Sequence, residues 1–346
     1  MRKLASIQTI KEVKNHPNAD KIEIVVFENI GWQCVSRKGE FKAGDRAVFF
    51  EIDSLIPMKY EWIKFLQDPN RPDKPVKLKT MRFRGEISQG LALPISILPP
   101  DCTIEEGKDL TSTLEIVKYE PEVPACLNGI VKGARRWIPK SDEERIQASP
   151  KLIEEFQNRL VVITQKIDGT SCTIAYNNGE EDVCGREWSY NESDNTYWKV
   201  ARKYDVLRKL KEIAEQTGIN FGIQGEIAGP SIELNRLALK DHDLFVFNVR
   251  NINTGRYLGF YEYKEFCDRL QLQMVPILQI AKFEWKSVEE LLELAKGKYA
   301  SGNYQEGIVI RPVEEFYSEV LKGRASFKAV NNDYLLEKEK RKKKGE

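Results

Sequence analysis

Four short segments of this chain place charged side chains at the end or in the middle of apolar, β-rich runs. They are Gln165-Lys166-Ile167-Asp168-Gly169, Gln224-Gly225-Glu226, Glu306-Gly307-Ile308-Val309-Ile310 and Ser326-Phe327-Lys328. In this order they supply an amine, three carboxylates and a second amine. That inventory suits a reaction in which a lysine attacks a nucleoside triphosphate with the help of a metal ion.

The set as a whole carries this interpretation, and no single segment does. Lys-x-Asp-Gly by itself is a weak signal, because Asp-Gly is above all a turn sequence. Four ordered and widely spaced elements are much harder to obtain by chance, and together they favour an enzyme.

The chemistry explains why these residue types are needed. A free lysine has a pKa of about 10.4, so burial, a nearby cation or a metal must favour its neutral form before it attacks. A divalent metal would spread the charge of the α-phosphate, and Asp168, Glu226 and Glu306 are its candidate ligands, directly or through water. A nucleotide on Lys166 would form a high-energy phosphoramidate and could pass to a second acceptor. Lys328 would offset the triphosphate's charge and help pyrophosphate to leave.

Composition limits the class of protein. The chain has 346 residues, enough for two or three domains. No stretch approaches the roughly 20 apolar residues that span a bilayer, and the first residues contain no apolar signal core. We therefore expect a soluble cytoplasmic protein. The net charge of +1 does not forecast nucleic-acid binding, so any basic surface must be local.

The cysteines and histidines indicate no metal centre. Six cysteines are scattered without a Cys-x-x-Cys pair, and only His16 and His242 could join them. In a large chain without a signal peptide, we expect these thiols to be reduced.

Residues 1–115 are expected to form a small β-barrel, because β-branched and aromatic runs alternate with glycine turns. The run 16–23 (HPNADKIE) resembles the opening of the tRNA-binding type of OB-fold, and a barrel kept only for folding is the alternative. Arg82, Phe83 and Arg84 would suit nucleic-acid binding by base stacking in a basic groove, although a solvated edge strand has the same pattern.

The rest of the chain is divided by composition. Residues 116–135 carry prolines and glycines with little periodicity and are expected to be a linker. Residues 136–336 are expected to form the catalytic domain. The lysine-rich residues 337–346 are expected to be a solvated, frayed tail.

Periodicity within the catalytic domain predicts both strands and helices. The expected strands are residues 160–165, 221–227, 244–249 and 307–311, and the expected helices are residues 197–218, 264–270 and 288–296. Residues 151–159 are expected to form a helix or a turn. Ser141 is followed by a glutamate three residues later, which predicts one more helix start. The strand 160–165 would deliver Lys166.

The ordered set resembles the covalent nucleotidyltransferase superfamily of polynucleotide ligases and messenger-RNA capping enzymes. Residues 166–169 match its nucleophile motif, and residues 224–226, 306–310 and 326–328 match its third, fourth and fifth motifs. Residues 244–249 match the aromatic strand that packs against the base. The fifth motif departs from the family pattern, because a serine holds its first position, so only its lysine is carried over.

The domain order narrows the resemblance. DNA ligases and capping enzymes carry the OB domain after the transferase domain, whereas here the barrel comes first. That order is similar to ATP-dependent nick-sealing RNA ligases, as is Thr170-Ser171 where DNA ligases usually have an arginine. The resemblance implies an α+β fold, with an N-terminal OB-type β-barrel followed by a nucleotidyltransferase domain of antiparallel sheets flanked by helices.

The same resemblance implies the site residues. The nucleotide-binding set would be Lys166, Arg145, Gln147, Arg186, Glu226, Phe247, Glu306 and Lys328, of which Lys166 and Lys328 would also be catalytic. ATP would be the AMP donor, with Mg²⁺ or Mn²⁺ as the metal. Surface charge is the alternative for Arg145 and Arg186, and core packing is the alternative for Phe247.

The implied function is an ATP-dependent RNA ligase that repairs RNA by joining 3′-hydroxyl and 5′-phosphate ends, with nicked duplex RNA as substrate and a monomer as its working form. A DNA ligase and a capping-type guanylyltransferase are the enzymatic alternatives. A noncatalytic RNA-binding protein that uses the barrel is the third.

Overall fold

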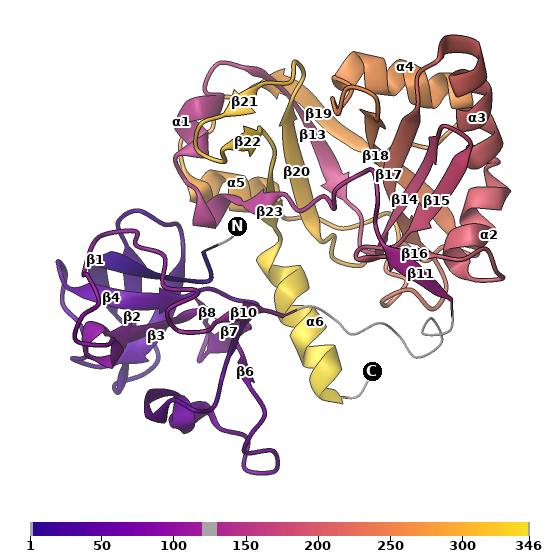
Figure 1. Cartoon of the computed structure of the whole chain (residues 1–346). Coiled ribbons are helices and arrows are strands. Elements are labelled where there is room, and N and C mark those ends of the chain that lie inside the picture. Colours follow the sequence, from indigo (N-terminus) through magenta and orange to yellow (C-terminus); the bar gives the residue numbers. More distant parts are fainter. Residues whose placement is uncertain (1–2, 120–129, 345–346) are drawn as a thin grey trace. The chain divides into compact units, whose positions relative to one another are not determined.

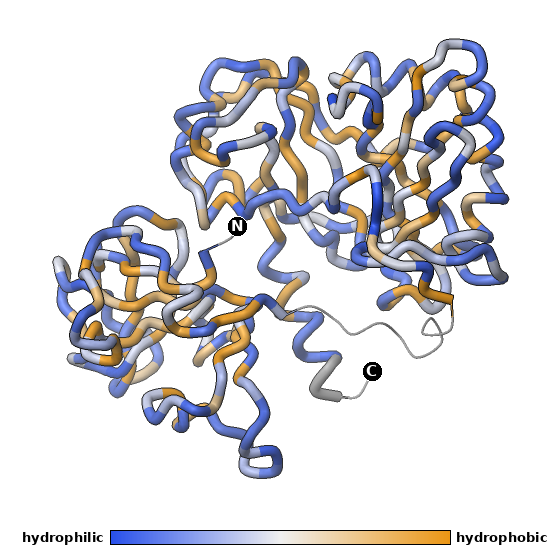
Figure 2. Tube along the Cα trace, in the orientation of Figure 1, coloured by the Kyte–Doolittle hydropathy of each residue, from blue (hydrophilic) through white to orange (hydrophobic). Residues whose placement is uncertain are grey.

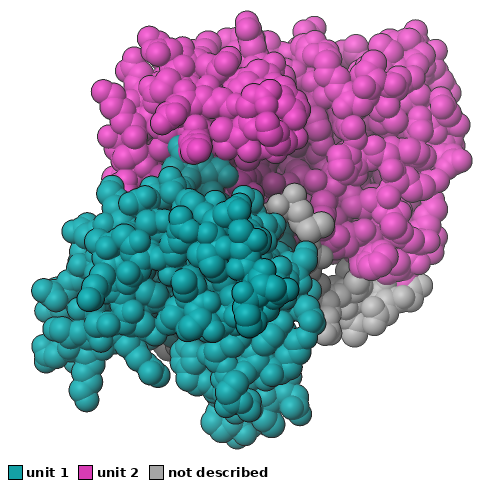
Figure 3. All heavy atoms as spheres, turned by 60° about the vertical axis from the view of Figure 1, so that its left-hand side comes forward, with its two compact units in different colours: residues 1–121, 146–150, 335–346 teal, residues 122–145, 151–334 magenta. Residues whose placement is uncertain are grey.

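The computed structural model describes residues 3–119 and 130–344, with side chains described to residue 341. The chain forms two compact units, coloured separately in Figure 3. The barrel unit comprises residues 1–121, 146–150 and 335–346, and the two-sheet unit comprises residues 122–145 and 151–334. Within the described residues, no helix is both long enough and apolar enough to cross a membrane.

The barrel unit is built on a five-stranded antiparallel sheet in the order β3-β2-β1-β4-β9. The strands are β1 (Ala5–Asn15), β2 (Ile22–Phe27), β3 (Gln33–Arg37), β4 (Arg46–Phe50) and β9 (Leu91–Pro94). The first half of β1 pairs with β4 and the second half with β2, with a register shift between Ile10 and Glu12. Because such a bulge bends a strand, β1 can serve both sides of a curled sheet.

Apolar residues cover both faces of this sheet. Phe49 and Phe50 are neighbours on β4 and are both fully buried, but they belong to different clusters. Phe49 packs with Val25 and Trp32, and Phe50 packs with Ile56. Figure 2 shows hydrophobic residues gathered on the strands.

Shorter elements complete the barrel unit. They are β5 (Ser54–Ile56), β6 (Val76–Lys77), β7 (Thr80–Phe83), β8 (Glu86–Gln89), β10 (Val117–Lys118) and the 3-10 helices η1 (Glu61–Leu66) and η2 (Ile95–Ile97). Strands β7 and β8 form a hairpin whose turn, Arg84-Gly85, has positive φ at both residues. The Phe83 carbonyl lies 2.9 Å from the His16 Nε2, which ties this hairpin to the chain after β1.

The two-sheet unit contains a six-stranded sheet and a five-stranded sheet (Figure 1). The first, in spatial order, is β11 (Val131–Ala134), β16 (Trp188–Tyr190), β15 (Glu180–Cys184), β14 (Thr170–Asn177), β17 (Phe221–Ala228) and β18 (Asp243–Asn251). The second is β12 (Glu144–Arg145), β23 (Phe327–Val330), β20 (Gly307–Pro312), β13 (Leu160–Lys166) and β19 (Ile277–Lys282). A small ribbon pairs β21 (Tyr317–Ser318) with β22 (Gly323–Arg324).

Helices flank these sheets. They are α1 (Leu152–Phe156), α2 (Thr196–Lys203), α3 (Val206–Thr217), α4 (Phe260–Leu270) and α5 (Val288–Leu294). A single apolar cluster joins α2, α3 and α4 to β14, β17 and β18, so these helices cover one face of the six-stranded sheet. The last helix, α6 (Asn332–Lys344), begins in the two-sheet unit and continues into the barrel unit.

The step from one sheet to the other places the predicted nucleophile. Strand β13 of the five-stranded sheet ends at Lys166, and β14 of the six-stranded sheet begins at Thr170. Only glycine fits at Gly169 between them, because a Cβ there would lie 2.3 Å from the Ile227 carbonyl oxygen. The close approach of this turn to β17 therefore explains the glycine of the Lys-x-Asp-Gly motif.

Several expectations about elements are wrong. The residues after Ser141 form β12 and a 3-10 helix at Ile146–Ala148 instead of an α-helix, because β12 pairs in parallel with β23. The single helix expected over 197–218 is two helices, broken where Asp205 adopts φ 52°. The tail is helical to Lys344, not frayed.

The residues predicted as a linker are only partly described. Their ends contain β10 and β11, both of which pair with other strands. Residues 120–129 lie outside the described residues.

Candidate active site

Lys166 lies at the end of β13 with its amine facing an acidic group. Its Nζ is 2.8 Å from Glu306 Oε2, and the two side chains are 23% and 18% exposed. The pairing of β13 with β20 sets this distance, because Lys166 is opposite Gly307, the residue after Glu306. A Cβ at Gly307 would lie 2.2 Å from the Ala329 carbonyl oxygen, so the glycine lets β20 pack against β23.

Glu226 adds a second acid beside this amine. It lies on β17 opposite Ser171 of β14 and is partly buried. Burial raises the pKa of Glu226 to about 8, although the Lys166 charge acts in the opposite direction. Burial alone would lower the pKa of Lys166, but the charges of Glu306 and Glu226 outweigh it and hold that pKa above its ordinary value.

Asp168 is buried in a separate set of contacts. Its Oδ1 accepts a hydrogen bond of 2.7 Å from the Tyr334 hydroxyl, and its Oδ2 lies 3.2 Å from Arg236 Nε. The side chains of Asp168 and Arg236 are 4% and 2% exposed, so this ion pair is almost fully removed from solvent. Neither Arg236 nor Tyr334 was expected from the sequence, because neither belongs to a motif.

The three predicted carboxylates do not converge on one point. Among residues 3–119 and 130–344, no group of three or more His, Cys, Asp or Glu side chains is arranged to hold a metal directly. The site can still gain the charge that suits a dication, since Glu226 and Glu306 face the single amine of Lys166 and a nearby positive ion would favour the ionised form of Glu226. The residues therefore fit a metal that keeps most of its water ligands.

Lys328 and Arg186 both form ion pairs with Asp142. Lys328 Nζ lies 3.1 Å from Asp142 Oδ1, and Arg186 Nη2 lies 3.0 Å from Asp142 Oδ2. Burial lowers the pKa of Lys328, and the nearby charges of Lys166 and Arg145 add to this. Arg145 on β12 is paired in register with Lys328 on β23, so the structure brings three of the predicted phosphate-contacting cations into one region.

Arg135 anchors the segment that carries Arg186. Its guanidinium donates to the carbonyls of Gly185 and Arg186, at 3.2 and 3.0 Å, and to Thr173 Oγ1 at 2.7 Å. This role could not be predicted from the sequence, because a buried arginine that binds carbonyl groups has no characteristic spacing.

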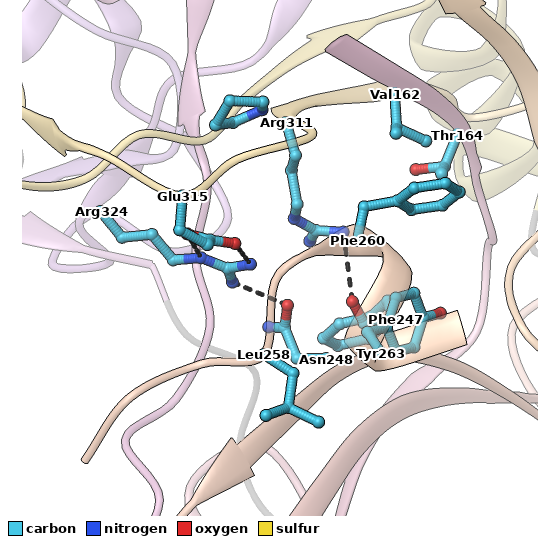
Figure 4. A pocket seen from close by; sticks show the side chains of 11 residues that line it. Val162, Thr164, Phe247, Asn248, Leu258, Phe260, Tyr263, Arg311, Glu315 and Arg324 are labelled. Atoms are coloured by element: carbon cyan, nitrogen blue, oxygen red, sulfur yellow. Dashed lines mark hydrogen bonds and ion pairs between the residues drawn. The ribbon is translucent and has the colours of Figure 1, made fainter. Parts of the chain in front are cut away.

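Phe247 lines a pocket within the two-sheet unit (Figure 4). Val162 and Thr164 form one wall, and they share a face of β13 with Lys166 because strand side chains alternate. The pairing of β17 with β18 skips Phe247, so this residue is a bulge that turns toward the pocket. Phe245, two residues earlier, is buried in an apolar cluster with Ile167, and Phe247 packs against that cluster.

Polar groups close the far side of this pocket. Arg324 Nη1 donates to Asn248 Oδ1 at 2.7 Å, and Arg324 Nε donates to Glu315 at 2.8 Å. Arg311 binds the Phe247 carbonyl and Glu143. Burial would raise the pKa of Glu143, but the Arg311 charge lowers it to about 2.

Gln147 belongs to the barrel unit. It is fully buried there, and its backbone carbonyl accepts a hydrogen bond of 2.8 Å from the Gly31 N–H. Its place in the nucleotide-binding set stays a prediction.

Comparison with known proteins gives matches over the whole chain. A family model described as RNA ligase matches residues 159–330, and a model described as the PHA02142 OB-fold domain matches residues 4–95. The Naegleria gruberi RNA ligase with PPi is 34% identical, covers 99% of this chain and 100% of its own, and has a TM-score of 0.85.

Two further structures of that ligase are equally similar. A mutant with ATP and Mn is 34% identical over 98% of both chains, with a TM-score of 0.83. A mutant with AMP and Mn is 34% identical over 96% of this chain and 98% of its own, with a TM-score of 0.84. No curated protein matches. The matches confirm the predicted α+β fold with an N-terminal OB-type barrel.

Proposed function

This chain belongs to the RNA ligase family, and we propose that it joins RNA 3′-hydroxyl and 5′-phosphate ends through a nucleotide carried on Lys166. The observation that carries the proposal is the Lys166 amine, held 2.8 Å from Glu306 beside Glu226, on the strand whose Val162 and Thr164 line an aromatic pocket. A nucleophile, acids for a metal and a surface for a base thus lie in one unit.

In the first step the neutral Lys166 amine attacks the α-phosphorus of ATP. A phosphorus–nitrogen bond forms, the α–β phosphorus–oxygen bond breaks, and pyrophosphate leaves while the amine gives up a proton. Because the pair with Glu306 keeps the amine protonated, binding of the nucleotide and its metal must weaken that pair first.

The next two steps return the amine to its starting state. An oxygen of the RNA 5′-phosphate attacks the AMP phosphorus, the phosphorus–nitrogen bond breaks, and Lys166 recovers its proton. The RNA 3′-hydroxyl then attacks the activated 5′-phosphate, forms the phosphodiester and expels AMP.

The pocket lined by Phe247 is proposed to hold the adenine, with Phe247 against its face and Val162 and Thr164 along its edge. Lys328 and Arg186 now pair with Asp142 and are proposed to exchange this carboxylate for the phosphates when the nucleotide binds. Arg145 would be a third cation at the phosphates. A role for Gln147 in nucleotide binding stays a prediction.

A divalent ion, Mg²⁺ or Mn²⁺, would offset the charge that develops on the α-phosphate. Glu226 and Glu306 would hold its water ligands, because these two acids face one amine and a dication would displace the proton that Glu226 holds at neutral pH. Asp168 would act on the ion through water, or only by orienting the turn after Lys166, since its carboxylate already contacts Arg236 and Tyr334. The Naegleria ligase structures contain Mn with ATP or AMP.

We propose nicked duplex RNA as the substrate and a cytoplasmic monomer as the working form. Residues 1–115 would act as the RNA-binding domain, 116–135 as a linker, 136–336 as the catalytic domain and 337–346 as a basic tail. On the β7–β8 hairpin, Phe83 is 38% exposed and lies between the exposed Arg82 and Arg84. An exposed aromatic ring flanked by cations suits contact with RNA bases and phosphates.

Incubation with ATP labelled in its α-phosphate and Mg²⁺ tests the proposal. The wild-type protein should become labelled and should seal a nicked duplex with an RNA 3′-hydroxyl end. Label from GTP in place of ATP would indicate a guanylyltransferase, and equal sealing of all-DNA nicks would indicate a DNA ligase. A wild-type protein that takes no label would leave RNA binding as its only role.

A further inference from the structure

Tyr299 lies in the loop between α5 and β20, outside every motif. Its side chain is 4% exposed and packs in an apolar cluster with Ile167, Ala228, Phe245 and Val275. Burial raises the pKa of Tyr299, so its hydroxyl keeps the proton. A tyrosine in such surroundings needs polar partners for its hydroxyl group.

Those partners are the backbones of three predicted active-site residues. The Tyr299 hydroxyl donates to the Lys166 carbonyl oxygen at 2.7 Å. It accepts the Asp168 N–H at 3.0 Å and the Glu306 N–H at 3.2 Å. A hydroxyl has one donor and two acceptor positions, and all of them are used here.

The pairing of β13 with β20 does not reach Asp168 and Glu306 and so does not hold their backbones together. The ladder between β13 and β20 ends where Lys166 faces Gly307, so Asp168 and Glu306 lie beyond its last pair. A side-chain hydrogen bond joins the residues just before Lys166 and Glu306, since Gln165 Nε2 donates to Gln305 Oε1 at 2.8 Å. Past that point the Tyr299 hydroxyl joins the two strand ends.

The loop itself is fixed to the residue that neutralises Asp168. Asn303 Nδ2 donates to the Arg236 carbonyl at 2.8 Å, and Ser301 Oγ donates to the same carbonyl. Arg236 in turn pairs with Asp168. The loop thus reaches the turn after Lys166 by two routes, through Tyr299 and through Arg236.

We propose that Tyr299 is a positioning residue for the transfer of AMP to Lys166. Its hydroxyl sets the Lys166 backbone against that of Glu306 and thereby aims the amine at the α-phosphorus. This inference rests on the proposed role of Lys166 as the nucleophile. Tyr299 needs no contact with ATP, so its loss should slow the attack and leave nucleotide binding unchanged.

The test compares Tyr299→Phe with Tyr304→Phe in the full-length protein. Tyr304 lies in the same loop, and among the described residues no hydrogen-bond partner is recorded for its hydroxyl, so the second variant controls for the loss of a loop hydroxyl. The measurements are the single-turnover rate of labelling by ATP, the Kd for ATP and the thermal unfolding curve. Misplacing a nucleophile by about 1 Å can cost about 100-fold, so we expect Tyr299→Phe to label about 10- to 100-fold more slowly at saturating ATP.

The expected result has three parts: slow labelling by folded Tyr299→Phe, a wild-type Kd for ATP and a wild-type rate for Tyr304→Phe. Labelling of Tyr299→Phe at the wild-type rate would overturn the inference. So would a loss explained entirely by weaker ATP binding or by a smaller folded fraction. If wild-type protein itself takes no label, the proposed function fails and not this inference alone.

A second variant decides the question if Tyr299→Phe does not fold. Asn303→Ala removes a hydrogen bond that holds the loop to Arg236 and leaves the Tyr299 hydroxyl in place. We expect a smaller loss of the labelling rate, again with unchanged ATP binding. A wild-type rate in Asn303→Ala would then count against the loop as the element that aims Lys166.

Discussion

Two acids, Glu226 and Glu306, face one amine at the centre of the site, and one of them keeps its proton. Burial raises the pKa of Glu226 to about 8, so the folded protein holds a proton that the unfolded chain releases near the ordinary value of 4.5. The folded state then binds more protons than the unfolded state between these two values, and stability falls as the pH rises through that window. Lys166 is charged in both states over this range and does not alter the sign.

Glu226→Gln should therefore stabilise the nucleotide-free protein in a pH-dependent way. Its melting temperature should exceed that of the wild-type protein by a margin that grows from pH 5 to about pH 8. Thermal unfolding without metal or nucleotide measures this. A margin that is constant with pH, or that shrinks as the pH rises, would show that Glu226 is already ionised in the folded state.

Asp142 forms ion pairs with Lys328 and Arg186, the two cations that are proposed to bind phosphate. In Asp142→Asn, Lys328 and Arg186 lose a competing negative charge, so pyrophosphate should bind more tightly. Partly exposed ion pairs contribute up to about 1 kcal/mol, which corresponds to an increase in affinity of about two- to fivefold. Calorimetric titration with pyrophosphate checks this, and weaker binding would mean that Asp142 orients the two cations.

Turns and bulges, more than the strands themselves, place the side chains of the site. Lys166 stands where the chain leaves one sheet for the other, and the β18 bulge turns Phe247 toward the pocket. Both features depend on close backbone approach, which is why glycines accompany the charged residues in the motifs.

Gly169→Ala should damage this junction. Its Cβ would lie 2.3 Å from the Ile227 carbonyl oxygen, which is backbone and cannot rotate away, so β17 must shift. We expect a loss of about 1–3 kcal/mol in unfolding free energy together with slower labelling by ATP. Gly323→Ala is the matched control, since the nearest atom to its Cβ would be 3.8 Å away. Equal stability of the two variants would refute the close-approach explanation.

Strands and motifs were predictable from the sequence, and the contacts that organise them were not. The apolar run before Lys166 predicted β13 almost to its ends, because a buried strand has a local signal. The helix start predicted at Ser141 was wrong, because the pairing of β12 with β23 outweighs the local capping pattern. Arg236, Tyr299 and Tyr334 lack any spacing signal, since they reach the motif residues only through tertiary folding.

For the whole molecule, the two units are proposed to divide the labour between nucleotide chemistry and RNA binding. The residues proposed to take part in the labelling of Lys166, apart from Gln147, belong to the two-sheet unit. Sealing of the proposed nicked duplex would also require the RNA to be held, and the barrel unit carries the exposed Arg82, Phe83 and Arg84.

A double variant, Arg82→Ala with Arg84→Ala, should separate these activities. Each lost phosphate contact weakens RNA binding and reduces its salt dependence, so sealing of nicked RNA should fall while labelling by ATP stays at the wild-type level. Lys38→Ala with Lys42→Ala, at two exposed lysines of the same unit, controls for the change in net charge. Unchanged sealing by the arginine variant would remove the hairpin from the RNA-binding surface.

The most direct measurement is to locate the nucleotide on the protein. Full-length enzyme treated with ATP and Mg²⁺ is digested under mildly alkaline conditions, which preserve a phosphoramidate, and its peptides are sequenced by mass spectrometry. AMP should be found on Lys166 alone and should be absent from Lys166→Ala. AMP on Lys328 or on any other residue, or modification that persists in Lys166→Ala, would contradict the assignment of the nucleophile.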